Sequence, residues 1–111
     1  MKYFGDDNYI AAGDMSGNVI GPTLDVRETK TQSFVATWTG TTPVGFLNVE
    51  VSNDGGTTWA ELSSDAVAGD TGSLAKTVGD IGWGFTRMSF IRTSGVGTLE
   101  VNSGIKVDDI R

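Results

Sequence analysis

The chain has 111 residues, which is the length of one domain. It has no Cys and no His, and 14 acidic residues against 8 basic ones give a formal net charge of −6. The composition excludes a disulfide framework, a thiol nucleophile and Cys- or His-ligated metals, and the scattered Lys and Arg residues disfavour nucleic acid and anionic membranes as partners.

The first 21 residues are rich in Gly and Asp and carry few large apolar side chains. Those before Met15 are Tyr3, Phe4, Tyr9 and Ile10. We expect residues 1–21 to form an extended N-terminal arm that becomes ordered against a partner through these four side chains, with one or two edge strands as the alternative. Residues 22–111 are then the folded domain. Neither a signal peptide nor an apolar run of membrane-spanning length is visible, so we expect synthesis in the cytoplasm.

Alternation of apolar and polar residues predicts strands through the rest of the chain, starting at residues 24–26. Further strands are expected at residues 34–38, 46–51, 59–62, 73–78, 85–93, 98–101 and 105–107, with turns at 40–43 and 94–97. The side chains expected to face the core are Phe34, Ala36, Trp38, Leu47, Val49, Val51, Met88, Phe90, Leu99 and Val101. Seven or eight short strands with almost no helix indicate an all-β fold, an antiparallel β-sandwich of jelly-roll type.

The sharpest local motif is Ser52-Asn53-Asp54-Gly55-Gly56-Thr57-Thr58-Trp59. The carboxylate of Asp54 can accept backbone N–H groups across a turn, and Gly55 or Gly56 can adopt a positive φ. Thr58 can bond back to the turn, and Trp59 can pack over it. The motif resembles the Asp-box hairpin of sialidases and other β-proteins at Ser52, Asp54, Gly56, Thr58 and Trp59. That resemblance implies a structural turn, and a propeller would need several copies.

A longer stretch, residues 33–102, carries a second resemblance. Its motifs are Trp38-Thr39-Gly40, then Val49-Glu50-Val51-Ser52-Asn53-Asp54-Gly55, then Arg92-Thr93-Ser94-Gly95-Val96-Gly97-Thr98-Leu99. The order is similar to that of small β-sandwich virion proteins of tailed bacteriophages, of the capsid decoration or head-fibre type. The resemblance implies a non-enzymatic virion protein that docks on the major capsid protein or another virion protein and forms a homo-oligomer. We expect the arm to add a strand to a partner's sheet edge.

A carbohydrate-binding β-sandwich is the alternative function. Trp83 lies between two glycines and near Asp80, so both are candidate glycan contacts on a loop. The competing interpretation is that Trp83 closes one end of the sandwich.

Other chemistry has weaker support in the sequence. Acidic pairs at Asp6–Asp7, Asp65 with Asp70, and Asp108–Asp109 could attract calcium, but solvated loop charge is the better interpretation. We assign no catalytic residue, no metal ligand and no cofactor. Arg87 and Arg92 are expected to pair with Glu50, Glu61 or Glu100 across strands, or to anchor an acidic partner.

Overall fold

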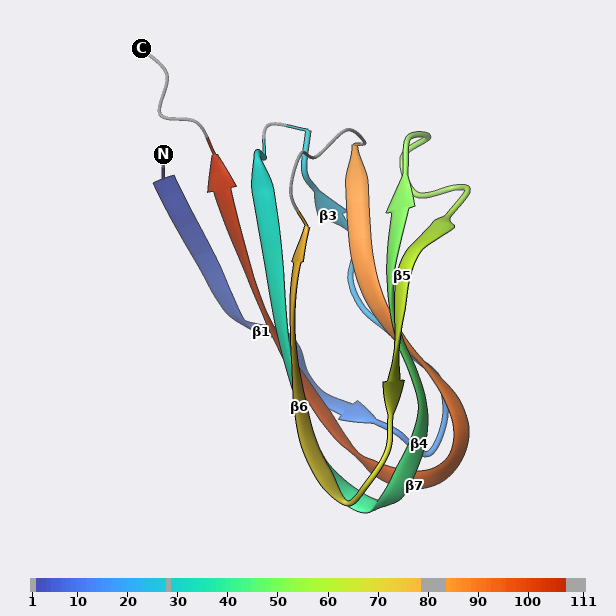
Figure 1. Cartoon of the computed structure of the whole chain (residues 1–111). Helices are drawn as coiled ribbons and strands as arrows, with labels where there is room; N and C mark the ends of the chain where they lie inside the picture. Colours follow the sequence, from blue (N-terminus) through green and yellow to red (C-terminus); the bar gives the residue numbers. More distant parts are fainter. Residues whose placement is uncertain (1, 28, 79–83, 108–111) are drawn as a thin grey trace.

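The computed structural model of the chain describes residues 2–27, 29–78 and 84–107, with side chains from Tyr9 to Lys106 within those ranges. The described residues form seven strands (Figure 1): β1 (Lys2–Asp14), β2 (Val19–Ile20), β3 (Leu24–Asp25), β4 (Thr31–Ser52), β5 (Ala60–Val67), β6 (Thr71–Val78) and β7 (Phe85–Val107). No membrane-spanning helix is found in this part of the chain.

All strand pairs are antiparallel and belong to one sheet, in the order β1-β7-β4-β5, with β2 and β3 on β7 and β6 on β4. The two longest strands, β4 and β7, pair along almost their whole length. Figure 1 shows both strands curving through a U, so the sheet folds back on itself. The result is a two-layer β-sandwich that is closed at one end by its own strands.

We call the two layers A and B. Layer A contains β1, residues 98–107 of β7, residues 31–41 of β4, and β6. Layer B contains β2 with β3, residues 85–94 of β7, residues 44–52 of β4, and β5. We number the segments 1 to 8 in chain order: β1 is 1, β2 with β3 is 2, the two halves of β4 are 3 and 4, β5 is 5, β6 is 6, and the two halves of β7 are 7 and 8. The strand order is then 1-8-3-6 in layer A and 2-7-4-5 in layer B. This order is a jelly roll, which confirms the predicted fold class.

The strands cross from one layer to the other at a bend, where the sequence predicted two turns. Residues 40–43 and 94–97 are irregular positions within continuous strands, because the register shifts between Thr41 and Gly45. Two glycines let the backbones meet here, since a Cβ on Gly40 would lie 2.3 Å from the Cα of Gly97. Gly95 also has a φ of 78°. The two segments predicted as turns therefore mark the line along which the sheet bends.

The core lies between the layers and matches the predicted alternation. Phe34, Ala36 and Trp38 of β4 face Leu47 and Val49 of the same strand across the sandwich, and all five are buried. The other predicted core residues are buried too, namely Met88, Phe90, Leu99 and Val101, whereas Val51 is half-buried at the open end. Burying one such side chain contributes about 1.5–3 kcal/mol, so this cluster provides the main stabilisation.

The N-terminal segment departs from the main expectation. Residues 2–14 are not a free arm, because β1 pairs with β7 from Lys2 opposite Val107 to Asp14 opposite Thr98. Tyr9, Ile10 and Met15 are buried in the core cluster. The edge-strand alternative therefore describes residues 2–14.

The hydroxyl of Tyr9 ties the two layers together at one side of the sandwich. It donates to the carbonyl oxygen of Pro22 at 2.5 Å and accepts from the backbone N–H of Met88 at 3.1 Å. Pro22 lies between β2 and β3, and it has no N–H with which to continue the pairing to β7. Tyr9 thus satisfies a backbone donor that the interrupted edge leaves open.

Candidate functional site

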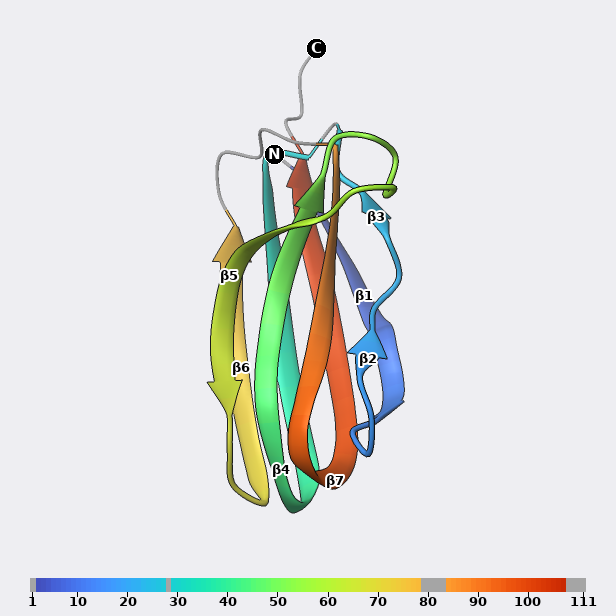
Figure 2. The ribbon, with the colours of Figure 1, turned by 90° about the vertical axis from the view of Figure 1, so that its right-hand side faces the viewer.

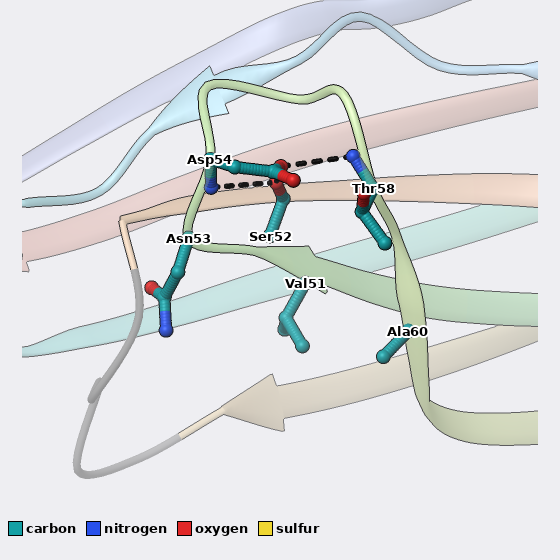
Figure 3. A pocket seen from close by; sticks show the side chains of 6 residues that line it. All are labelled: Val51, Ser52, Asn53, Asp54, Thr58 and Ala60. Atoms are coloured by element: carbon teal, nitrogen blue, oxygen red, sulfur yellow. Dashed lines mark hydrogen bonds between the residues drawn. The ribbon is translucent and has the colours of Figure 1, made fainter.

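The predicted turn residues meet in the connection between β4 and β5 (Figure 3). The hydroxyl of Ser52 donates to Oδ1 of Asp54 at 2.7 Å and accepts from the N–H of Gly56 at 3.0 Å. The N–H of Thr58 donates to the same Asp54 oxygen at 2.8 Å. Gly55 and Gly56 have φ values of 77° and 91°, which favour glycine. The motif therefore closes a turn with its own polar groups.

These bonds also set the charge state of the turn. The backbone N–H of Thr58, followed by the hydroxyl of Ser52, lowers the pKa of Asp54 to about 2. A general acid at neutral pH needs a raised pKa, so Asp54 is tuned in the opposite direction. Its ionised carboxylate is an acceptor for the turn.

An open depression of about 370 Å³ lies beside this turn, lined by Val51, Ser52, Asn53, Asp54, Thr58 and Ala60 (Figure 3). Several of its polar atoms are engaged within the protein, including Oδ1 of Asn53, which accepts from the N–H of Gly84 at 2.8 Å. The lining thus uses its hydrogen bonds to connect the turn to the start of β7.

Residues 53–59 form what we call the strap, because they extend over the outer face of layer B. Figure 2 shows this loop reaching across β7 towards β3. Gly56 lies near Thr23 between β2 and β3, since a Cβ on Gly56 would be 3.8 Å from the side chain of Thr23. The indole N–H of Trp59 donates to the carbonyl of Gly56 at 2.9 Å, which holds the strap in shape.

Arg87 fixes the strap to the sheet beneath it. Its guanidinium carbon lies 4.2 Å from the centroid of the Trp59 ring, and its Nε lies 2.8 Å from Oε1 of Glu50. The hydroxyl of Ser89 donates to the same carboxylate oxygen at 2.9 Å. The predicted pairing of Arg87 with Glu50 is confirmed. Arg92 instead donates through Nε to the carbonyl of Gly95 at 2.8 Å and has no ion pair among the described residues.

Below the strap, the outer face of layer B exposes large apolar side chains. Ile20, Phe46 and Leu62 are 52%, 47% and 42% exposed, and half-buried Ile91 lies directly opposite Phe46. We call Ile20, Phe46, Leu62 and Ile91 the patch. Sequence reasoning did not single it out, although one signal was present: Phe46 alternates with Asn48 and Glu50 on the polar side of its strand.

The other residues that the sequence proposed as contacts have different outcomes. Tyr9 and Ile10 are corrected from partner contacts to core residues, because the strand that carries them packs into the sandwich. The backbones of Tyr3 and Phe4 pair with Lys106 and Ile105, while their side chains lie outside the described residues. Trp83 and Asp80 also lie outside them.

Of the acidic residues considered for calcium, Asp65 and Asp70 have other partners, while the side chains of Asp6 and Asp7 lie outside the described residues. Asp65 pairs with Lys76 at 3.2 Å, and Asp70 accepts from the N–H of Thr42 at 2.9 Å. Asp108 and Asp109 lie outside the described residues. Within the described part of the chain, no three His, Cys, Asp or Glu residues are grouped so as to hold a metal ion.

No protein-family model matches the chain, and no curated protein matches it.

Proposed function

We propose that this chain is a non-enzymatic structural protein of a bacteriophage virion, bound on the capsid exterior as a decoration or minor capsid protein. The observation that carries the proposal is the strand order of the two layers, 1-8-3-6 and 2-7-4-5. Jelly rolls of this order form many capsid domains, and they also form lectins, so the support is an analogy of fold. The resemblance of residues 33–102 to phage virion proteins points to the first use.

The surface of the sandwich supports a role in protein assembly. Formal charge of −6 keeps free copies soluble, and the exposed apolar side chains of layer B provide a surface for protein contact. We do not propose that a free N-terminal arm docks on the partner, because β1 is already paired with β7.

Binding of the purified chain to capsid shells that lack it tests this function. The shells and protein are mixed and sedimented, and bound protein is counted against the major capsid protein. We expect binding that saturates at a fixed ratio, as a repeated site requires. An unrelated sandwich of similar size and charge is the control. The proposal fails if the chain stays in the supernatant at all concentrations.

A glycan-binding role is the second candidate, supported by two hydroxyl-lined grooves on layer A. One, of about 120 Å³, is lined by Thr37, Trp38, Thr39, Thr98 and Glu100. The other, of about 160 Å³, includes Thr31, Ser33, Thr77 and Lys106 beside Gly104. Glycan-array binding that is lost in Thr39→Val would favour this candidate, and binding unaffected by that change would remove these grooves from it.

A further inference from the structure

The depression beside the strap has an apolar floor. Val51 and Ala60 are directly opposite each other in the pairing of β4 with β5, so their side chains lie on the same face of the sheet. Figure 3 shows both on one side of the hairpin, below the bonds that close the turn. The volume of about 370 Å³ is within the range of roughly 300–1,000 Å³ for sites that hold small molecules. The depression therefore has room for one long side chain of a partner.

The rim of the depression carries the charge of Asp54. Its Oδ1 accepts from the hydroxyl of Ser52 and the N–H of Thr58, which fixes the carboxylate in place. These hydrogen bonds, rather than a neighbouring cation, lower the pKa of Asp54 to about 2. Asp54 forms no ion pair among the described residues, and none of the described residues that line the depression is basic. The rim thus holds a fixed anion that lacks a cation within the described part of the chain.

A basic side chain is the ligand that fits this combination of floor and rim. Lys and Arg place their aliphatic stems on apolar surfaces while the charged head stays at a polar border. Arg fits better, because its planar guanidinium presents several donors at once to the carboxylate of Asp54 and the hydroxyl of Thr58. A metal ion fits less well, since the described residues contain no group of three His, Cys, Asp or Glu that could hold one. The formal charge of −6 also attracts basic segments over a longer range.

We propose that the depression binds an arginine side chain on a basic segment of the partner protein. The stem lies on Val51 and Ala60, and the guanidinium pairs with the carboxylate of Asp54. That the partner is a capsid protein rests on the proposed function, whereas the chemistry of the site does not. An exposed ion pair contributes little affinity, so a single arginine should bind with a dissociation constant in the millimolar range. Such a contact determines which partner is accepted and in which orientation.

A titration followed by NMR tests the site with a capped arginine tripeptide, acetyl-glycyl-arginyl-glycinamide. We expect saturable chemical-shift changes at Val51, Asp54, Thr58 and Ala60, and added salt should weaken the binding. The matched probe is the citrulline tripeptide, in which a neutral urea of similar size replaces the guanidinium. It should bind at least threefold more weakly. Equal binding of the two probes, or shift changes that do not saturate or lie away from the depression, would overturn the proposal.

A pair of variants tests the role of the carboxylate. Asp54→Asn removes the charge but keeps a side-chain oxygen that can accept from Ser52 and Thr58, and it should raise the dissociation constant of the arginine tripeptide at least threefold. Asp14→Asn is the matched control, because Oδ1 of exposed Asp14 likewise accepts a backbone N–H in a turn, that of Ser16 at 3.0 Å. It should leave binding unchanged. Circular dichroism establishes that both variants are folded, and mass spectrometry that the new amide before Gly55 has not hydrolysed. Equal effects of the two changes would contradict the proposal.

Shell binding separates this proposal from the proposed function. We expect Asp54→Asn to weaken the binding of the chain to capsid shells and Asp14→Asn to leave it unchanged. If Asp54→Asn binds shells as well as the wild type, the arginine contact is wrong and the virion role stands. If the wild type binds the arginine tripeptide at the depression but binds no shell, the virion role is wrong and the arginine site stands.

Discussion

Removal of one hydroxyl at Tyr9 tests how the N-terminal strand is held. In Tyr9→Phe the ring still fills its place in the core, but the N–H of Met88 and the carbonyl of Pro22 lose their partner. A buried polar group left without a partner costs about 1–3 kcal/mol. With two groups affected, we expect the free energy of unfolding to fall by about 2–3 kcal/mol, a large part of the roughly 5–15 kcal/mol typical of a domain.

Urea unfolding followed by circular dichroism measures this loss. The control is Thr37→Val, which removes an exposed hydroxyl from the outer face of layer A and should change stability by no more than about 0.5 kcal/mol. If Tyr9→Phe is as stable as the wild type, then the hydroxyl does not connect the layers, and the account of β1 as a built-in strand is refuted.

The same hydroxyl has a signature at high pH. Burial raises the pKa of Tyr9 to about 12 from its ordinary value near 10. The stability that this protonated hydroxyl provides is complete below pH 10 and is lost as pH rises to 12, because the unfolded chain releases the proton first. Two units correspond to about 2.7 kcal/mol. The stability difference between the wild type and Tyr9→Phe should therefore shrink across this range, and a constant difference would contradict the assignment.

Three further outcomes follow from the packing. Deletion of residues 1–21 should leave an unfolded or strongly destabilised chain by circular dichroism, since it removes three buried core residues; a cooperative melt at the wild-type temperature would show that the arm is dispensable. Gly72→Ala should cost about 1–3 kcal/mol in urea unfolding, because its Cβ would lie 2.3 Å from the indole of Trp38; wild-type stability would show that the ring can move. Replacing both Asp65 and Lys76 by Val should produce strand-mediated aggregates in light scattering, and a soluble double variant would show that this pair does not guard the edge.

The alternation of side chains was enough to predict the sandwich and most of its core. Phe34, Ala36 and Trp38 are buried where the period of two places them, and Arg87 points to the other face of its strand, where it meets Glu50. These features depend on neighbours in one strand or in a directly paired strand. Local sequence therefore contains the information that determines them.

The bend and the strap could not be read in this way. In the sequence, Gly40 and Gly97 each look like a turn residue. Only their close approach between neighbouring strands shows that they lie where the whole sheet bends. Likewise, Trp59 covers its own turn as expected, with its indole N–H on the carbonyl of Gly56, but its stacking on Arg87 depends on the turn extending across β7. Both features arise from contacts between residues that are distant in the sequence.

The N-terminal segment shows the same limit. Tyr9 lies between acidic residues and glycines, and no alternating pattern around it predicts that its side chain is buried. Its position in the core depends on the gap that Pro22 creates in the opposite layer. The patch, in contrast, was within reach of the sequence, since Phe46 stands at a position that should be polar. An apolar residue on the polar side of a predicted strand is a signal for contact.

Electron cryomicroscopy of virions assembled in cells that carry this gene tests the central claim most directly. The account predicts a two-layer sandwich on the outer surface of the shell at a repeated position, with this chain present among the virion proteins in mass spectrometry. The claim would be contradicted if the shells of these virions showed no such density and mass spectrometry did not find the chain among the virion proteins.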